Sequence, residues 1–394
     1  MIVESPRRAA LAAVAFIFAA GACSAPNQTV RPLVERLAPG NDVWRTHFID
    51  AGQALAMVLE FPCGAVLVDT GAEHNPSFDG VERLRLYLDR FFERRTDLDR
   101  TFALVVVTHP HIDHTRGLPM VLERYRVLNI IDNGMTHGSG GAQQAAMLRR
   151  VAEPPDGAAA IGHRSIFVRD IVDPAGLTDA VIDPLQCATI DPKIKVLWGQ
   201  LDEDPGWGGN RYGRTHFANA NNHSVVLRVD YGKASALLPG DLEPPAIALL
   251  LARSASTGVL DVDIYQVAHH GSSNGTTPGL VEAMTPAISV FGSGEEKRHI
   301  AWTAWKYGHP RLEIVEMLEH ATTRRRRSVE VPVGVGGSSF VAHHVDRALY
   351  ASGWDGHVVV EARADGTMRV VFEGRADRGA TSWPLPQPLP RDHH

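Results

Sequence analysis

The stretch that decides the fold reads Thr-His-Pro-His-Ile-Asp-His and runs from Thr108 to His114. Within six residues it holds four candidate metal ligands: His109, His111, Asp113 and His114. The apolar β-forming run 104–107 leads into it and a helical pattern over 118–125 follows, which predicts a loop leaving the end of a buried strand. At such a turn, alternate side chains can converge on one point.

Imidazole and carboxylate groups are ligands that Zn²⁺, Mn²⁺ and Fe ions accept. The spacing predicts that His109 and His111 hold one ion and that Asp113 and His114, turned the other way, contribute to a second. Two neighbouring ions can activate a water and stabilise both the attacking and the leaving oxygen of a hydrolysis. The alternative is a histidine-rich loop without chemistry, because the chain has 19 histidines. Four ligands directly after a strand favour the metal site.

His-x-His-x-Asp-His is the motif of the metallo-β-lactamase superfamily, which the chain resembles over about residues 43–372. Further motifs follow in the order of one branch, which comprises the C-terminal nuclease-like domain of the DNA-uptake protein ComEC and its stand-alone secreted relatives. These motifs are Phe48–Gln53, Val66–Gly71, Asn221–Leu227, Leu238–Glu243, Val267–Ser272 and Tyr307–Pro310. The resemblance implies an α+β fold, a four-layer αββα sandwich of two mixed sheets flanked by helices, with metals at one edge.

The resemblance also implies a role for each candidate residue. His109, His111 and Asp241 would hold the first ion, and Asp113, His114, Asp241 and one of His269 or His270 the second. Asp69, at the end of a strand, would orient the ligands from behind. His309, just before a helix, would donate a proton or hold a phosphate oxygen.

The third ligand of the first ion stays open. Most members of the superfamily use a histidine, and His223 is the candidate here, with His216 weaker. The ComEC-like branch usually has Asn where this chain has His223.

These residues predict a hydrolase that uses a metal-bound hydroxide, with Asp113 and His309 in catalytic roles. It would hold two divalent ions, Zn²⁺ in the first place, with Mn²⁺ or Fe as alternatives. The motifs of the ComEC-like branch favour a phosphodiester substrate, either nucleic acid or an envelope phosphodiester such as a phosphocholine ester. One alternative is a lactonase or β-lactamase acting on a cyclic carbonyl, which the weak third-histidine signal disfavours. Another is a non-catalytic envelope lipoprotein.

Composition restricts the partners and the metal chemistry. The formal net charge of −6 counts mildly against a protein that binds nucleic acid mainly through phosphates, although it allows a local basic groove. The three cysteines include no Cys-x-x-Cys pair, which argues against a cysteine metal cluster. Cys63 and Cys187 would pair in an oxidising compartment; two free thiols fit the sequence equally well.

The N-terminus predicts export from a bacterial cell. Arg7 and Arg8 precede the apolar run 9–20, which is too short to span a membrane, and small residues then lead to Cys23. We expect a signal peptide over 1–22 and an acylated Cys23 that anchors a lipoprotein on the periplasmic side of the envelope. Ordinary cleavage and free secretion is the alternative.

The rest of the chain divides into three parts. We expect a tether over 23–42, a hydrolase domain over 43–375 and a Pro-rich polar tail over 376–394. An enlarged insertion over about 134–216 is expected at the rim of the active site, where loops usually set substrate choice. The four-arginine run 324–327 is expected in a solvated loop.

Overall fold

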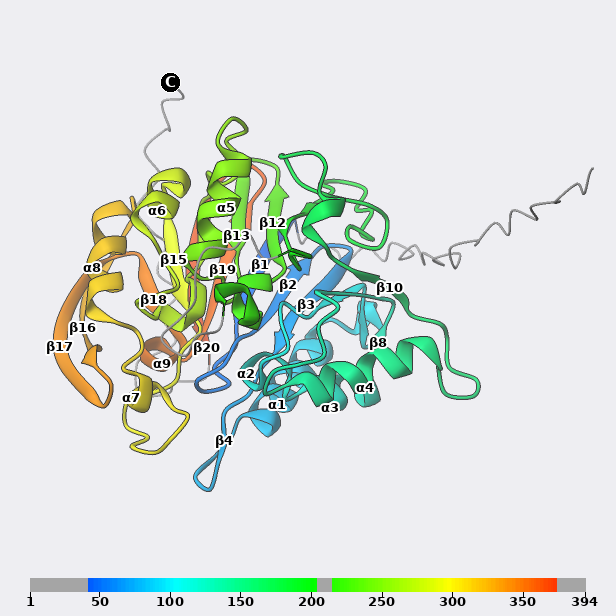
Figure 1. The fold of residues 1–394 in the computed structure, drawn as a ribbon, viewed down its shortest axis with the longest axis horizontal. Helices are drawn as coiled ribbons and strands as arrows, with labels where there is room; N and C mark the ends of the chain where they lie inside the picture. Colours follow the sequence, from blue (N-terminus) through cyan, green and yellow to red (C-terminus); the bar gives the residue numbers. More distant parts are fainter. Residues whose placement is uncertain (1–41, 204–214, 374–394) are drawn as a thin grey trace, which may run out of the picture.

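Two β-sheets packed face to face form the centre of the molecule, with helices on both outer faces (Figure 1). The structure is a computed structural model that describes residues 42–203 and 215–373. The expected signal peptide, all but the last residue of the tether, and the polar tail lie outside this part, so these boundaries stay predictions. Within the described ranges, no helix has the length and apolar character needed to cross a membrane.

Eight described strands form the first sheet, in the order β10-β9-β7-β3-β2-β1-β19-β20. The strands from β3 to β10 run parallel and the others antiparallel, so the sheet is mixed. Their bounds are β1 Val43–Phe48, β2 Ala56–Phe61, β3 Gly64–Thr70, β7 Leu104–Val106, β9 Asn129–Asp132, β10 Gly162–Ser165, β19 His357–Arg363 and β20 Met368–Glu373.

Six described strands form the second sheet, in the order β11-β12-β13-β14-β15-β18. Here the first three strands pair antiparallel, and those from β13 to β18 pair parallel. Their bounds are β11 Lys193–Trp198, β12 Val226–Tyr231, β13 Ala234–Leu238, β14 Ile264–Gln266, β15 Ile288–Phe291 and β18 Leu349–Ala351.

Successive side chains of a strand point to opposite faces of its sheet, so each sheet packs against the other sheet on one face and against helices on the other. In β3, Val66 and Val68 join the core between the sheets, whereas Leu67 faces the helices outside. Helices α1 (Gly80–Arg94), α3 (Leu118–Arg124) and α4 (Gly141–Ala152) cover the first sheet. Helices α5 (Pro244–Ser254), α6 (Pro278–Met284) and α8 (Leu312–Ala321) cover the second. The predicted αββα sandwich is confirmed.

The remaining elements lie outside the two sheets and the covering helices. The long strands β16 Arg325–Gly336 and β17 Ser339–Arg347 form a separate hairpin. The short elements are α2 Ile112–Thr115, α7 Ala304–Tyr307, α9 Ser352–Asp355, β4 His74–Asn75, β5 Phe78–Asp79, β6 Thr101–Phe102, β8 Arg126–Val127, and the 3₁₀ helices η1 Thr96–Leu98, η2 Val168–Asp170, η3 His216–Ala218, η4 Ala220–His223 and η5 Ala268–Gly271.

The described part of the segment 134–216, expected as an insertion, is built into the sandwich. It supplies α4 and an edge strand to each sheet, β10 to the first and β11 to the second. Cys63 and Cys187, whose pairing the sequence left open, form a disulfide with Cα atoms 5.3 Å apart. This bond ties the β2–β3 turn to the segment before β11. Because it closes a loop of more than a hundred residues, it restricts the unfolded chain strongly.

The arginine run 324–327 does not form the expected solvated loop. It opens β16, which pairs with β17 in a hairpin outside α8 (Figure 1). Arg325 pairs with Asp346. The mostly buried Arg326 makes hydrogen bonds of 2.6 and 3.0 Å to Asp355. Arg324 donates to the backbone carbonyls of 366 and 368. The fold itself therefore uses three of the four guanidinium groups.

Glu60, on β2, is a buried carboxylate whose ionisation stabilises the fold. Burial opposes its charge, but the hydrogen bond from His47 and the charges of Arg45 and Arg95 outweigh that effect and lower the pKa to about 2. A folded-state pKa below the ordinary 4.5 means that the stabilisation is present above pH 4.5 and is lost as the pH falls towards 2.

We therefore expect Glu60→Gln to lower the free energy of unfolding at pH 7 by about 3 kcal/mol. The difference from the wild type should shrink between pH 4.5 and pH 2, measured by urea unfolding at a series of pH values. Glu123→Gln, an exposed position on α3, is the control and should change stability by less than about 0.5 kcal/mol. A Glu60→Gln defect that does not vary with pH would contradict the assignment.

Candidate metal centre

Loops from both sheets meet at one edge of the sandwich. Asp69 lies at the end of β3, and the segment 108–114 follows β7. Asp241 follows β13, and residues 269–270 follow β14. The parallel pairings β3–β7 and β13–β14 bring the carboxyl ends of these strands together, which places the loops side by side.

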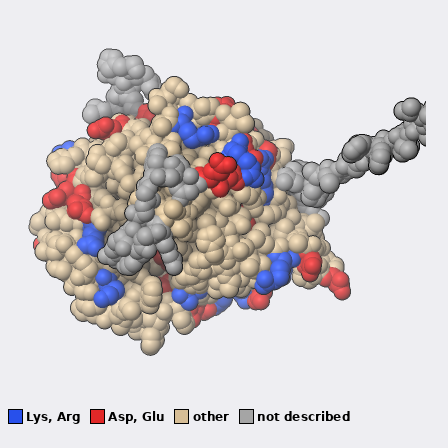
Figure 2. All heavy atoms as spheres, viewed as in Figure 1, with Lys and Arg blue, Asp and Glu red and all other residues tan. Residues whose placement is uncertain are grey.

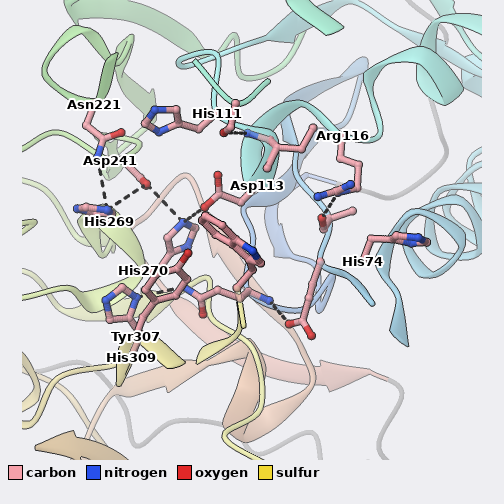
Figure 3. A pocket seen from close by; sticks show the side chains of 16 residues that line it. His74, His111, Asp113, Arg116, Asn221, Asp241, His269, His270, Tyr307 and His309 are labelled. Atoms are coloured by element: carbon pink, nitrogen blue, oxygen red, sulfur yellow. Dashed lines mark hydrogen bonds and ion pairs between the residues drawn. The ribbon is translucent and has the colours of Figure 1, made fainter. Parts of the chain in front are cut away.

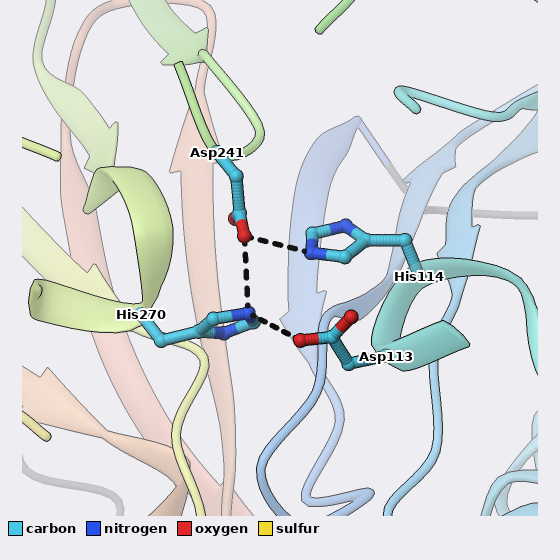
Figure 4. A group of neighbouring side chains, drawn as sticks. All are labelled: Asp113, His114, Asp241 and His270. Atoms are coloured by element: carbon cyan, nitrogen blue, oxygen red, sulfur yellow. Dashed lines mark ion pairs between the residues drawn. The ribbon is translucent and has the colours of Figure 1, made fainter. Parts of the chain in front are cut away.

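Four side chains converge at this edge: Asp113, His114, Asp241 and His270 (Figure 4). One ligand atom from each lies within 4.8 Å of all the others. Oδ2 of Asp241 is 3.2 Å from Nε2 of His114 and 3.4 Å from Nε2 of His270. The same nitrogen of His270 is 3.5 Å from Oδ2 of Asp113. The first half of the chain contributes two of these ligands and the second half the other two.

In His114 and His270, the hydrogen bond made by Nδ1 determines whether Nε2 acts as a donor or an acceptor. Nδ1 of His114 is 2.7 Å from Oδ2 of Asp69, and Nδ1 of His270 is 2.5 Å from the carbonyl of Gly292. Both contacts need a proton on Nδ1, which leaves an Nε2 lone pair facing a carboxylate oxygen in the neutral ring.

Two of these facing atoms, Nε2 of His114 and Nε2 of His270, are buried without a hydrogen-bond partner among the described residues, and so is the other carboxylate oxygen of Asp241, Oδ1. Acceptors that face one another in a buried site are costly unless a cation lies between them. The residues therefore fit a divalent metal ion.

Electrostatics lead to the same conclusion. Burial lowers the pKa of His114, but the carboxylates of Asp241 and Asp69 outweigh it and raise that pKa well above its ordinary value. The same balance, with Asp241 and Asp113, raises the pKa of His270 to about 10. In the absence of an ion, protons compensate the carboxylates. Metal binding must then release protons and must weaken as the pH falls.

Asp69 holds His114 from behind. Its carboxylate accepts hydrogen bonds from the backbone N and the Oγ1 of Thr108, at 2.8 and 2.7 Å, as well as from His114. Asp69 is fully buried and has a φ of 56°, which is uncommon for a residue with a side chain and occurs at functional sites. The structure gives Asp69 the geometry expected of an orienting carboxylate.

His109 and His111 form a second pair of nitrogen ligands. Nε2 of His109 lies 3.1 Å from Nδ1 of His111. Burial and the neighbouring His114 and His111 lower the pKa of His109 well below its ordinary value, so its ring is neutral. Nδ1 of His109 faces the hydroxyl oxygens of Thr108 and Ser224, at 3.1 and 3.4 Å. The two facing nitrogens could hold one ion beside the four-residue group.

His269 and His270, which the sequence does not distinguish, have different surroundings. His270 belongs to the four-residue group. His269 lies at its side, with Nε2 3.8 Å from Oδ2 of Asp241 and 3.4 Å from Nδ2 of Asn221 (Figure 3). Both have left-handed φ values, 51° and 55°. This sharp turn gives the two rings different directions.

The structure does not bring His223 to the centre. Its Nδ1 accepts a hydrogen bond of 2.9 Å from the backbone N of Leu201, and its Nε2 lies 2.8 Å from the carbonyl of Phe217. Both ring nitrogens are therefore used by the backbone. Asn221 lines the pocket instead, and its Oδ1 is buried without a hydrogen-bond partner in the described chain.

His309 lines the pocket beside Tyr307, next to His269 and His270 (Figure 3). The amide of Gln53 is oriented by Gly294, whose N donates to Oε1, so Nε2 of Gln53 donates to Nδ1 of His309 at 3.1 Å. Burial lowers the pKa of His309 well below its ordinary value. The ring is thus neutral with its proton on Nε2, which suits hydrogen bonding to an oxygen better than proton donation.

A pocket of about 450 Å³ opens in front of these residues. Asp113, Asp241 and His270 line it, and Arg116 and His74 lie on the side away from His269 (Figure 3). Gln53, Arg116 and Trp302 are lining residues that the sequence did not single out as candidates. Gln53 lies within the motif Phe48–Gln53, whereas Arg116 and Trp302 belong to no recognisable motif.

Comparison with known proteins decides the family. Residues 49–291 match the family model described as "Metallo-beta-lactamase superfamily". The chain belongs to the metallo-β-lactamase superfamily. It is 36% identical over 127 residues to "Recombination protein 2" of Haemophilus influenzae, covering 32% of this chain and 14% of that protein. It is 26% identical over 117 residues to "ComE operon protein 3" of Bacillus subtilis, covering 28% and 13%. These relatives confirm the resemblance to the ComEC-like branch.

Two further proteins are similar to this chain. An uncharacterized protein of Escherichia coli, YcaI, is 26% identical over 270 residues, 67% of this chain and 26% of that one. The chain thus spans about a quarter or less of the curated relatives it matches. Among solved structures, the short form of human tRNase Z is similar with a TM-score of 0.33 and 12% identity, covering 62% of this chain and 91% of that one.

Metal content tests the centre directly. We expect Asp241→Asn to reduce the divalent metal bound per chain by at least half, because Asp241 faces both His114 and His270. The measurement is elemental analysis after dialysis against limiting Zn²⁺. Asp230→Asn, which removes a carboxylate paired with Arg228 on β12, is the matched control and should leave the metal content unchanged. Equal metal content in both variants would contradict the centre.

The same measurement tests His223. We expect His223→Asn to bind as much metal as the wild type, since neither ring nitrogen is available to an ion. Asn can still accept the hydrogen bond from Leu201, which limits damage to the loop. Loss of one ion from a variant with an unchanged circular dichroism spectrum would show that His223 is a ligand after all.

Proposed function

We propose that the protein is a metal-dependent phosphodiesterase that acts with two divalent ions, Zn²⁺ in the first place. The observation that carries this is the group Asp113, His114, Asp241 and His270, in which nitrogen lone pairs face carboxylate oxygens beside an open pocket. Membership of the superfamily supports a hydrolase. The four-residue group would hold the second ion, and His109 and His111, together with Asp241, would hold the first.

Divalent ions in such a site lower the pKa of a water and stabilise negative charge on the reacting oxygens. The chain's own residues supply the rest. Asp69 fixes the direction of His114, and the carbonyl of Gly292 fixes that of His270. His309, neutral and protonated on Nε2, holds a phosphoryl oxygen by a hydrogen bond. Overall, water adds to phosphorus, the bond to the leaving oxygen breaks, and that oxygen takes up a proton.

Arg116 supports a phosphodiester rather than an uncharged substrate. It lines the same pocket as the metal ligands, and its Nε is held by a hydrogen bond of 2.8 Å to the carbonyl of Ala72. A fixed guanidinium group is well suited to a phosphate oxygen. The alternative of a lactonase or β-lactamase loses support, because such enzymes normally hold their first ion with a third histidine and His223 is engaged elsewhere.

The charge distribution supports a compact recognition site over an extended basic one. Basic and acidic residues are interspersed over the face shown in Figure 2, in keeping with the net charge of −6. Binding of nucleic acid would then depend on the pocket and its rim more than on a broad electrostatic surface.

The disulfide supports export. Structural disulfides persist in oxidising compartments and are rare in the bacterial cytosol, and Cys63–Cys187 lies in the core between the sheets. We therefore keep the proposal of a cell-envelope protein on the periplasmic side, with Cys23 as the lipid-anchored residue.

Hydrolysis of bis-p-nitrophenyl phosphate beside a chromogenic cephalosporin tests this function. We expect the mature protein with added Zn²⁺ or Mn²⁺ to hydrolyse the phosphodiester and to lose activity on chelation. Asp113→Ala should reduce turnover at least 100-fold because it removes one of the four converging ligands, whereas Asp230→Asn should match the wild type.

Two outcomes would change the conclusion. Turnover of the cephalosporin alone would move the substrate to cyclic carbonyls. Unchanged phosphodiester turnover in Asp113→Ala at full metal occupancy would refute the mechanism, and bound metal without any turnover would favour a binding protein.

A further inference from the structure

Trp302 is an exposed aromatic side chain at the metal pocket. It is 77% exposed, yet it lines the same pocket as Asp113, Asp241 and His270. Among the large hydrophobic side chains that the described residues leave exposed, it is the one aromatic. Its φ of 62° is left-handed, a conformation that is unfavourable for a bulky residue and tends to persist where function requires it. The position of Trp302 therefore calls for an explanation beyond packing.

The segment that carries Trp302 is firmly held on both sides. Thr303 is fully buried, and its Oγ1 lies 2.8 Å from the carbonyl oxygens of Arg298 and Ile300. Arg298 is bound by Glu73, with Nε 2.7 Å from Oε1, and stacks over Phe78 at 4.1 Å. Because these contacts fix the backbone, the indole is presented to the pocket by a rigid support.

This support is connected to the reaction site. Glu73 also accepts a hydrogen bond of 2.8 Å from the backbone N of Gln53, and the amide of Gln53 donates to His309. The position of Trp302 relative to His309 is thus set by a chain of buried polar contacts, through Arg298, Glu73 and Gln53.

Aromatic rings lead from Trp302 towards the metal ligands. Trp302 meets Tyr307 edge to face, with ring centroids 6.4 Å apart. Tyr307 stacks on His309 at 5.5 Å, and His309 lies 6.2 Å from His269. A flat group placed against Trp302 would therefore lie along a wall that ends at the reacting atoms.

Positive charge lies on the side of the pocket away from Tyr307 and His309. Arg116 is placed there, next to His74 (Figure 3), and its Nε donates a hydrogen bond to the carbonyl of Ala72. A ligand that fits both walls carries a flat π system and, next to it, an anionic group. A quaternary ammonium ion fits less well, because Arg116 would repel it and the edge-to-face contact of Trp302 with Tyr307 does not enclose it as an aromatic cage does.

We propose that Trp302 is a stacking platform for a nucleobase, so that the substrates are phosphodiesters of nucleosides, namely nucleotides or the ends of single-stranded nucleic acid. This rests on the proposed phosphodiesterase function and specifies its substrate class. Stacking on an aromatic side chain is favourable for every base, which predicts little preference for sequence.

Two chromogenic esters with the same leaving group test the platform. Thymidine 5′-(p-nitrophenyl phosphate) carries a base, and methyl p-nitrophenyl phosphate does not. We expect Trp302→Ala to lower kcat/KM for the thymidine ester about 5- to 100-fold and to change that for the methyl ester less than about 3-fold. Trp302→Phe should retain most of the activity. Val172→Ala, at an exposed position that does not line the pocket, is the control.

An equal loss on both esters, or no loss on either, would overturn the platform while leaving the phosphodiesterase intact. If the wild type hydrolyses neither ester, the proposed function is refuted. A binding measurement then tests the role of Trp302 on its own. Fluorescence anisotropy with a labelled oligothymidylate and its abasic analogue, in the presence of a chelator, needs no catalysis.

In that measurement the wild type should bind oligothymidylate more tightly than the abasic strand, and Trp302→Ala should bind the two alike. A wild type that does not distinguish the strands, or a Trp302→Ala variant that still does, would overturn the proposal.

Discussion

The carboxylate of Asp69 is the group on which the centre depends. It accepts three hydrogen bonds, two from Thr108 and one from His114, and it is fully buried at the end of β3. These contacts fasten the start of the ligand loop to the neighbouring strand and fix the proton of His114 on Nδ1. The other nitrogen of that ring faces Asp241 and is an acceptor when the ring is neutral. One buried carboxylate therefore determines both the path of the loop and the chemistry of its last ligand.

The metal centre links the two halves of the chain, because ligands from both halves face one another and need a cation between them. Asp113 and His114 come from the first sheet's loops, and Asp241 and His270 from those of the second. Their closest atoms are acceptors that face one another, which is unfavourable in a buried site unless positive charge lies between them. A bound ion would relieve this repulsion and also join the sheets at the edge where the core between them ends. Metal binding and the stability of this edge are therefore coupled.

The pocket in front of the ligands is asymmetric. One wall is aromatic and rigid, with Trp302 held by contacts that pass through Arg298, Glu73 and Gln53 to His309. The other carries Arg116, whose guanidinium is tied to the backbone of Ala72. The four converging ligands belong to neither wall, so the groups that would bind metal are separate from those that would contact the rest of the substrate. This division is common where catalytic residues stand on strand ends and loops supply recognition.

The sequence by itself determined the layers and predicted the candidate ligands of the metal centre. A continuous apolar run such as 65–68 predicts a strand that is buried on both faces, and His-x-His-x-Asp-His after a strand predicts ligands at its end, because both depend on local pattern and spacing. Tertiary structure alone decided which of His269 and His270 joins the ligands, since two successive left-handed residues turn their rings apart. It also engaged His223 with the backbone, paired Cys63 with Cys187 and placed the arginines of β16 in ion pairs. Trp302 and Arg116 come from distant segments and line the same pocket, so their proximity cannot be predicted from their spacing along the chain.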